Sequence, residues 1–306
     1  MAQQTFANYF AEWLELYKRG AVRDVTFQKY ENTLAHIRTL APKQRLSTLN
    51  RQAYQQLLND YATNHERQTV MDFHHQMKAS LLDALDEGLI KTDPTRKVVI
   101  KGTVQRNHKT KFLHQHEMSA LLAQLNLDDT LNTDYLVLLI AKTGLRISEA
   151  LGLTPTDFDF KHHVIKISKT WDYKHSIGQF APTKNKSSVR KIPLDWQTAM
   201  MFSQLVRDLP QETPIFVNPE KRVYVQTLNN RLETLCHTAG IPVISLHGLR
   251  HSHASLLLYA GVSIATVSRR LGHSTMNTTQ RIYLHVIQEL ENADNDKIMR
   301  YLTSLM

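Results

Sequence analysis

The chain has 306 residues, 42% of them hydrophobic, which is enough for two ordinary domains that each bury a core. Its 37 basic and 28 acidic residues give a formal charge of +9, which favours a polyanionic partner such as nucleic acid. The single cysteine, Cys236, excludes a disulfide framework within the chain and fits a reducing compartment. No apolar run is long enough to span a bilayer, and Met1–Gly20 shows no charged-then-apolar secretory leader, so we expect a soluble cytoplasmic protein.

The first part of the sequence predicts helices. Apolar residues recur at helical spacing between Phe6 and Tyr17, and further helical patterns cover about Val25–Leu40, Arg51–Tyr61 and Thr69–Leu85. None of these segments alternates convincingly, as a half-buried strand would. Together they predict a small all-α domain over residues 1–94.

A basic stretch over residues 95–111 follows, and we interpret it as the linker between two domains. Pro94 and Gly102 interrupt regular structure beside and within it. Its basic residues are Arg96, Lys97, Lys101, Arg106, Lys109 and Lys111. Such a stretch is either a solvated tether or a segment that lies along a phosphate backbone, so we take these six as candidate DNA contacts.

Residues 112–306 predict a larger, mostly helical domain with a small antiparallel sheet. The sheet is indicated by alternating segments at Val164–Ile167 and Ser188–Ile192. Helical patterns cover His116–Leu125, Asp134–Lys142, Trp196–Leu205, Thr227–Thr238, Leu246–Tyr259, Ile264–Leu271 and Thr278–Leu290. A tail over Lys297–Leu305 has apolar residues at near-helical spacing. The expected fold class is therefore mainly α, with a small all-α domain joined by a basic linker to the larger domain.

Two segments of the larger domain combine arginine with other polar residues. TGLRISEAL places Arg146 after a glycine turn, with Glu149 three residues further along one helical face. LHGLRHSHAS places His247 and Arg250 three residues apart, so that both point the same way from one helix. Each pair alone is more often surface decoration or structural than catalytic.

Two further segments add a histidine, a hydroxyl group and a lysine. LGHSTMNTTQRIY places His273 at a helix end and Tyr283 ten residues later. APTKNKSSVRKIPL predicts a hairpin over Ala181–Leu194 with Lys184 at its turn. A lone tyrosine in such a pattern usually belongs to the core. The whole set is different, because two arginines, two histidines, a lysine and a hydroxyl suit attack on a phosphodiester.

Phosphodiester cleavage by a hydroxyl group needs this combination. The five-coordinate phosphorus carries about one extra negative charge, so cations must already be in place. Arginine suits this because its fork holds two phosphate oxygens and stays charged. A phenol with a pKa of about 10 needs positioning, a base and positive charge nearby. The leaving 5′ oxygen needs a proton, which a lysine of lowered pKa can deliver.

In order and approximate spacing, the four segments resemble the signature boxes of the tyrosine recombinase (phage integrase) family. The match covers about Lys111 to His285, and the first domain is similar to the core-binding domain of that family. The resemblance implies that Arg146 and Arg250 clamp the scissile phosphate. It also implies Lys184 as general acid, His247 as base or proton shuttle, His273 as hydrogen-bond donor to the phosphate, and Tyr283 as nucleophile.

Two of these assignments stay open. Lys186 rivals Lys184, because the register of the predicted hairpin cannot be fixed from one sequence, although the TK match favours Lys184. Glu149 is expected to orient Arg146 rather than to take part in the chemistry.

A metal site is a competing interpretation of the histidines. The candidates are His247, His251 and His253 on one helix, and His114 with His116. No nearby cysteine or obvious carboxylate completes a ligand set, and 16 histidines make chance clusters common, so we expect no metal. The resemblance implies a reaction without metal, ATP or organic cofactor, because the phosphotyrosine bond stores the energy of the broken linkage.

The resemblance also implies partners. Members of the family close two domains around double-stranded DNA, form a 3′-phosphotyrosyl bond and exchange strands through a Holliday junction as a tetramer. The tail helix, with Ile298, Met299, Leu302 and Leu305, is expected to pack on a neighbouring subunit or on its own domain. Accessory DNA-bending or excision factors can be further partners, in the cytoplasm of a bacterium or a phage-infected host.

Within the family, FANYFAEWLELYK and the C-terminal boxes resemble integrases of phages and integrative elements. Many of these carry an arm-binding domain ahead of the core-binding one, for which helical pattern from the start leaves no room. Either the natural protein lacks it or the sequence is truncated, so a cellular chromosome-dimer-resolving recombinase remains in contention. A type IB topoisomerase and a non-catalytic DNA-binding protein on the same fold are two further candidate classes.

Overall fold

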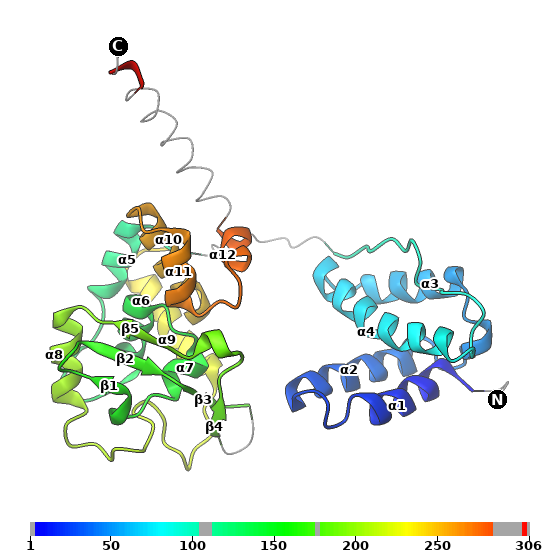
Figure 1. The fold of residues 1–306 in the computed structure, drawn as a ribbon, viewed down its shortest axis with the longest axis horizontal. Coiled ribbons are helices and arrows are strands. Elements are labelled where there is room, and N and C mark those ends of the chain that lie inside the picture. Colours follow the sequence, from blue (N-terminus) through cyan, green and yellow to red (C-terminus); the bar gives the residue numbers. More distant parts are fainter. Residues whose placement is uncertain (1–3, 104–111, 175–177, 284–301, 305–306) are drawn as a thin grey trace. The chain divides into compact units, whose positions relative to one another are not determined.

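The computed structural model describes residues 4–103, 112–174, 178–283 and 302–304 (Figure 1). The chain divides into two compact units, Met1–His108 and Lys109–Met306. The described residues of the first unit form helices and no strand, apart from isolated bridges, and the second unit is mostly helical with small antiparallel sheets. The predicted fold class is therefore confirmed.

The first unit is built from four helices around one core. They are α1 (Phe6–Tyr17), α2 (Asp24–Leu40), α3 (Arg51–Ala62) and α4 (Arg67–Asp86), with a 3-10 turn η1 (Leu46–Thr48) before α3. The aromatic residues of α1 are buried because they recur on one helical face. Among them, Trp13 donates a hydrogen bond of 2.6 Å from its indole nitrogen to Asp83 on α4.

The first half of the predicted linker lies on this unit. Val98 and Ile100 pack against its core, and the backbone nitrogen of Val99 donates to Gln55 on α3. The basic residues of this half, Arg96, Lys97 and Lys101, are exposed. The other three candidate DNA contacts, Arg106, Lys109 and Lys111, lie outside the described residues.

The second unit contains eight described helices and five strands. The helices are α5 (Gln115–Leu122), α6 (Thr133–Thr143), α7 (Ile147–Leu151), α8 (Trp196–Leu205), α9 (Val225–Thr238), α10 (Leu246–Tyr259), α11 (Ile264–Leu271) and α12 (Met276–Ile282). The strands are β1 (Phe158–Asp159), β2 (Val164–Ile167), β3 (Lys169–Asp172), β4 (Gln179–Pro182) and β5 (Arg190–Pro193), with 3-10 turns η2 (Pro155–Asp157) and η3 (Lys186–Ser188). The predicted tail helix lies mostly outside the described residues, which include only 302–304 of it.

Helix α6 is the centre of this unit. Its apolar run is buried on all sides, and α10 and α9 pack against it. It ends at Gly144, whose φ of 69° is left-handed. A Cβ at Gly144 would also lie 2.6 Å from the ring of His253, so a side chain there meets both backbone strain and a clash. Glycine is therefore required where the chain turns towards Arg146.

The strands form two separate sheets, which in Figure 1 lie on the side of the unit away from α10 and α12. Strand β2 pairs antiparallel with both β1 and β5, and Ile165 faces Ile192 across the β2–β5 pair. Strand β4 pairs with β3. The prediction of a single hairpin over Ala181–Leu194 is therefore wrong. The β4 ladder stops at Pro182, which has no N–H to donate, and η3 then carries the chain to the other sheet.

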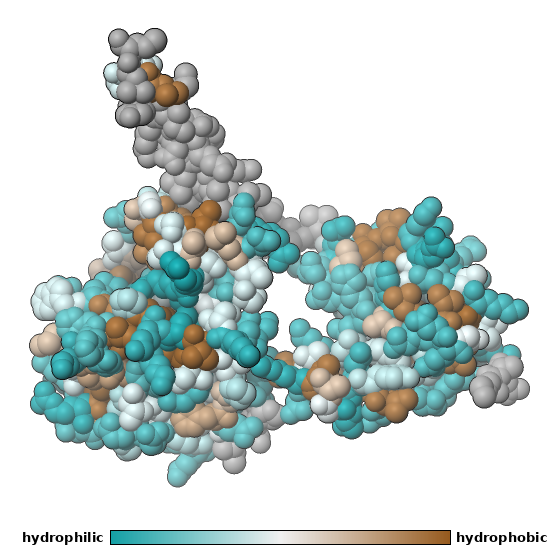
Figure 2. All heavy atoms as spheres, in the orientation of Figure 1, coloured by the Kyte–Doolittle hydropathy of each residue, from teal (hydrophilic) through white to brown (hydrophobic). Residues whose placement is uncertain are grey.

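The visible face of each unit is mostly hydrophilic, with apolar side chains in small groups rather than a continuous band (Figure 2). Consistent with this surface, the described part of the chain contains no helix with the length and apolar character needed to cross a membrane.

Candidate active site

Two arginines from separate elements of the second unit lie close together. Arg146 is the residue before α7, directly after the turn at Gly144, and Arg250 lies on α10. Burial, and then the charge of Arg146, lower the pKa of Arg250. Arg250 nevertheless stays charged at neutral pH, because the ordinary pKa of a guanidinium is so high. The two predicted phosphate clamps are therefore brought together.

Backbone carbonyls at the ends of two helices hold both guanidinium groups. Arg250 donates to the carbonyl oxygens of Gly144 at 2.6 Å and of Leu271 at 2.7 Å. Arg146 donates to the carbonyl oxygen of Gly272 at 3.0 Å. Gly144 ends α6, and the other two residues end α11. Carbonyls at a helix C-terminus lack an intrahelical partner and carry partial negative charge, so they stabilise cations.

A third arginine, which no sequence motif singled out, completes the cluster. Arg190 on β5 donates to the carboxylate of Glu149 with both terminal nitrogens, at 3.1 and 2.9 Å. Its Nε donates to the carbonyl of Arg270 at 2.6 Å. Glu149 also accepts a hydrogen bond of 2.6 Å from Arg146. Burial alone would raise the pKa of Glu149, but the hydrogen bond and charge of Arg190 and the charge of Arg146 hold it below its ordinary value.

We expect Glu149→Gln to lower the free energy of unfolding of the second unit by about 3–5 kcal/mol at pH 7, because Arg146 and Arg190 lose their counter-charge. The folded state favours the ionised carboxylate, so its stabilisation is complete above the ordinary pKa of 4.5. That stabilisation is lost as the pH falls through the lower pKa of the folded state. The difference between native and variant chains should therefore shrink in acid.

Urea unfolding at pH 7 and in acid measures this effect, followed by the fluorescence of Trp171 and Trp196 in a Trp13→Phe background. The control is Glu212→Gln, because Glu212 is an exposed carboxylate of the same unit. Equal losses in the two variants would contradict the expected role of the buried carboxylate.

The two predicted catalytic histidines lie beside the arginines. His247 is on the first turn of α10, and its pKa is lowered by desolvation and then by the charges of Arg250 and Arg146. His273 follows α11, and its Nδ1 is 2.7 Å from Oγ1 of Thr279. Burial, followed by the charge of Arg250, lowers the pKa of His273 to about 4. Both imidazoles are therefore mainly neutral near pH 7.5, and each can accept a proton or donate a hydrogen bond.

Tyr283 directly follows α12 and is 2% exposed. Its ring belongs to a cluster of buried residues with Ala254, Leu258, Val267 and Leu271. Its hydroxyl oxygen is 3.0 Å from Nδ1 of His251. Burial raises the pKa of Tyr283 to about 12, whereas the charge of Arg250 acts in the opposite direction. The predicted nucleophile therefore lies in the same unit as Arg250 and within range of its charge.

Lys184 follows β4 in the segment that leads to the arginine cluster, and its side chain is exposed. Its rival, Lys186, begins η3 and is also exposed. Two residues further on, Ser188 is buried, and its Oγ is 3.5 Å from a terminal nitrogen of Arg146. The segment thus reaches the cluster, and the choice between the two lysines stays a prediction.

The histidines that were considered as metal ligands make different contacts. His251 contacts Tyr283, whereas His253 is buried, with Nδ1 2.9 Å from the carbonyl of Ala141 and Nε2 accepting from Arg270 at 2.9 Å. The described residues contain no group of three or more His, Cys, Asp or Glu side chains that could hold a metal ion.

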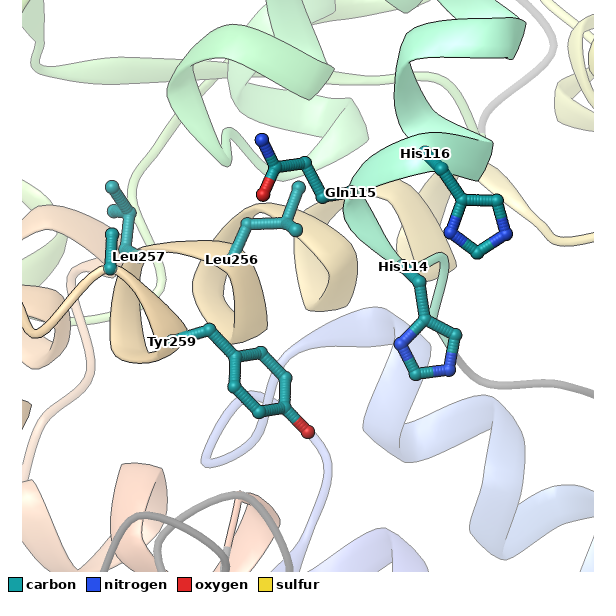
Figure 3. A pocket seen from close by; sticks show the side chains of 7 residues that line it. His114, Gln115, His116, Leu256, Leu257 and Tyr259 are labelled. Atoms are coloured by element: carbon teal, nitrogen blue, oxygen red, sulfur yellow. The ribbon is translucent and has the colours of Figure 1, made fainter. Parts of the chain in front are cut away.

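A pocket of about 820 Å³ lies beside the start of α5 and the end of α10; we call it the α5–α10 pocket. His114, Gln115 and His116 line one side, and Leu256, Leu257 and Tyr259 line the other (Figure 3). Ala260 also lines the pocket. In Figure 3 the rings of His114 and Tyr259 project to the same side of the two helices. Two leucines and aromatic rings give this surface the character of a site for apolar side chains.

Two residues of the cluster were not expected from the sequence to act there. Arg190 could have been found from its alternation with Ile192 on one face of β5, which places an arginine towards the interior. His251 is four residues after His247 and therefore on the same helical face, but it was considered only as a metal ligand.

The chain is similar to recombinases in sequence. Residues 111–289 match the model of the phage integrase family. The chain is 27% identical to a "Tyrosine recombinase XerC-like" protein of Caldanaerobacter subterraneus subsp. tengcongensis, over 92% of this chain and 80% of that protein. It is 28% identical to the ICEBs1 integrase of Bacillus subtilis, over 70% of this chain and 61% of that protein.

Solved integrases share its fold. The Tn1549 transposon integrase, in complex with transposon right end DNA, aligns with a TM-score of 0.80 and 18% identity, over 97% of this chain and 100% of that one. A lambda integrase dimer bound to a core site gives a TM-score of 0.66 and 14% identity, over 90% and 97%. The family model spans more than half of the 306 residues, so the chain belongs to the phage integrase family. It is a site-specific tyrosine recombinase, which confirms the predicted class.

Proposed function

We propose that this chain cuts and rejoins duplex DNA through a 3′-phosphotyrosyl bond to Tyr283. The observation that carries the proposal is the position of this tyrosine. Its hydroxyl lies in the same unit as Arg250, near enough for the arginine charge to affect its pKa, and beside an imidazole. A phenol, paired guanidinium groups and neutral imidazoles are the groups that phosphoryl transfer to a side chain needs.

In this proposal Arg146 and Arg250 hold the non-bridging oxygens of the scissile phosphate. Tyr283 attacks the phosphorus and releases a 5′ hydroxyl, which receives its proton from Lys184. His273 donates a hydrogen bond to the phosphate, and His247 acts as base or proton shuttle. The free 5′ hydroxyl then attacks the phosphorus of the 3′-phosphotyrosyl bond on the partner duplex and displaces that tyrosine. This gives a Holliday junction, which a second round resolves.

The experiment that tests the proposal is a suicide-substrate trap. Nicked duplexes carrying candidate attachment sites lose a short fragment on cleavage, so the covalent protein–DNA adduct accumulates and is seen on a denaturing gel. We expect an adduct with the native chain, and we expect it to form equally in the presence of EDTA. Cleavage that leaves no adduct and stops with EDTA would favour a metal-dependent nuclease, and binding with neither cleavage nor adduct would favour a non-catalytic DNA-binding protein. Relaxation of plasmids without a cognate site would favour a topoisomerase.

For the biological role we propose integration and excision of a phage or mobile element. Relatives named for this role include the ICEBs1 integrase and the transposase of Tn916 from Enterococcus faecalis, which is 25% identical over 71% of this chain. The alternative is resolution of chromosome dimers by a cellular recombinase. Recombination between plasmid-borne attachment sites, compared with recombination between two copies of a chromosomal resolution site, distinguishes the two roles.

We further propose that the active species is a tetramer on two DNA sites, in the cytoplasm of a bacterium or phage-infected host. The α5–α10 pocket is our candidate site for the apolar tail of a neighbouring subunit. Leu302, which belongs to this tail, is 51% exposed. Accessory DNA-bending or excision factors would act on the same complex. The exposed residues Arg96, Lys97 and Lys101 are candidate contacts to the phosphate backbone.

A further inference from the structure

The hydroxyl group of Tyr283 is held by a residue outside the predicted catalytic set. Its oxygen is 3.0 Å from Nδ1 of His251, and the two ring centroids are 5.8 Å apart. Burial raises the pKa of this phenol to about 12, so at neutral pH it keeps its proton. The proton must therefore be removed as the oxygen attacks phosphorus, and a base has to lie within hydrogen-bond distance of it.

We propose that His251 is the catalytic residue that accepts the phenolic proton of Tyr283 during strand cleavage and returns it during rejoining. This inference rests on the function proposed above and names one further participant in it. His251 touches the reacting oxygen, whereas the predicted base, His247, lies one helical turn away with its ring at right angles and its centroid 4.6 Å from that of His251.

The step balances without any other reactant. In the tautomer with hydrogen on Nε2, Nδ1 of His251 carries a lone pair and accepts the hydrogen bond of the phenol. As the O–H bond of Tyr283 breaks, its proton moves to Nδ1 and the oxygen–phosphorus bond forms. The bond between phosphorus and the 5′ oxygen breaks, and that oxygen takes a proton from Lys184. Rejoining reverses each transfer.

The surroundings of His251 suit this role. Tyr283 faces it from the end of α12, His247 from its own helix, and His273 from the turn between α11 and α12. Burial and the arginines lower the pKa values of both neighbouring histidines. Both are therefore mainly neutral near pH 7.5, and neither carries an extra proton that it could give to His251. Arg250 stabilises the phenolate as it develops, since its charge lowers the pKa of Tyr283. His251 is half-buried, so a proton on its ring can pass to solvent or to His247.

The test uses the native 306-residue chain and two variants, His251→Asn and His251→Ala. The asparagine side chain puts an amide near the place of Nδ1 and keeps a hydrogen bond to the phenol, but it cannot accept a proton. On the nicked duplex that traps the native chain, we expect the rate of adduct formation to fall by about 100-fold or more in both variants. The native rate should rise with pH between about 5 and 8, as a histidine base requires, and this rise should disappear in His251→Asn. Added imidazole should partly restore His251→Ala.

A second substrate separates removal of the phenolic proton from protonation of the leaving group. Replacing the bridging 5′ oxygen by sulfur gives a thiolate leaving group, which departs without a proton because a thiol has a pKa of only about 8.5. This duplex should restore cleavage by Lys184→Ala and leave His251→Asn slow. The matched control is His237→Asn on α9. The side chain of His237 is 68% exposed, so this variant should cleave at the native rate.

The possible outcomes distinguish failure of the His251 inference from failure of the proposed function. Cleavage by His251→Asn at the native rate, with an adduct that still needs Tyr283, would overturn this inference and leave the proposed function standing. Faster cleavage would also overturn it, because His251 would then restrain the tyrosine rather than activate it. An adduct that forms without Tyr283, or no adduct with the native chain, would overturn both. Recovery of His251→Ala with imidazole would exclude misfolding as the cause of its slow cleavage.

Discussion

A Tyr283→Phe chain is expected to bind the cognate duplex with native affinity and to form no covalent adduct. The change removes one hydroxyl group and keeps the ring that packs with Leu258, Val267 and Leu271, so the fold should persist. Removing a covalent nucleophile lowers the rate by at least about 10⁴-fold, which on a nicked duplex means no band above background. The measurement is the denaturing-gel assay, read beside a gel shift that reports binding.

The matched control is Tyr224→Phe. Tyr224 lies directly before α9 and is 58% exposed, so the same chemical change there should leave the adduct unaffected. If Tyr283→Phe formed the adduct while Tyr224→Phe did not, the nucleophile would have been assigned to the wrong residue. Adduct formation by both single variants would mean that neither phenol is the nucleophile.

Arg250→Ala is expected to lower strand cleavage by about 10³-fold or more, because one preorganised donor at a developing charge is already worth 10²–10³ in rate. Arg250 is 3% exposed and joins two helix ends through the carbonyls of Gly144 and Leu271, so the alanine variant also weakens the fold. Arg250→Lys separates the two effects. It keeps the positive charge but loses the planar fork, so a folded lysine variant should still cleave much more slowly than the native chain.

Single-turnover rates on the nicked duplex, with circular dichroism to confirm folding, measure these variants. Arg207→Ala, at an exposed arginine of the same unit, is the control for general loss of positive charge. A folded Arg250→Lys chain that cleaves at the native rate would contradict the assignment of the Arg250 fork to the scissile phosphate.

Much of the fold could be predicted because its signals are local. The helices of the first unit follow from apolar residues at helical spacing, and α6 follows from an uninterrupted apolar run that ends at glycine. The strand pairing could not be predicted in the same way. Whether β5 pairs with β4 or with β2 depends on contacts between residues far apart in sequence, and local alternation does not encode the partner.

The residues of the candidate site also differ in whether a local motif or a tertiary contact identifies them. Arg146, His247, Arg250, His273 and Tyr283 could be named because short motifs surround them, and the structure brings them together. Arg190 and His251 were not assigned to the site because their importance depends on tertiary contacts. One of these contacts is a buried carboxylate 41 positions away, and the other is a phenol 32 positions away.

The end of α11 has a mechanical consequence for the enzyme. Its last carbonyls accept hydrogen bonds from Arg250 and Arg146, and the chain reaches α12 and Tyr283 within twelve residues of Leu271. A displacement of this turn that swings the nucleophile towards or away from DNA therefore also strains the bonds that aim both guanidinium groups. The position of the Tyr283 hydroxyl and the orientation of Arg146 and Arg250 therefore depend on the same short backbone segment. Substitutions that loosen it are expected to impair both together rather than either alone.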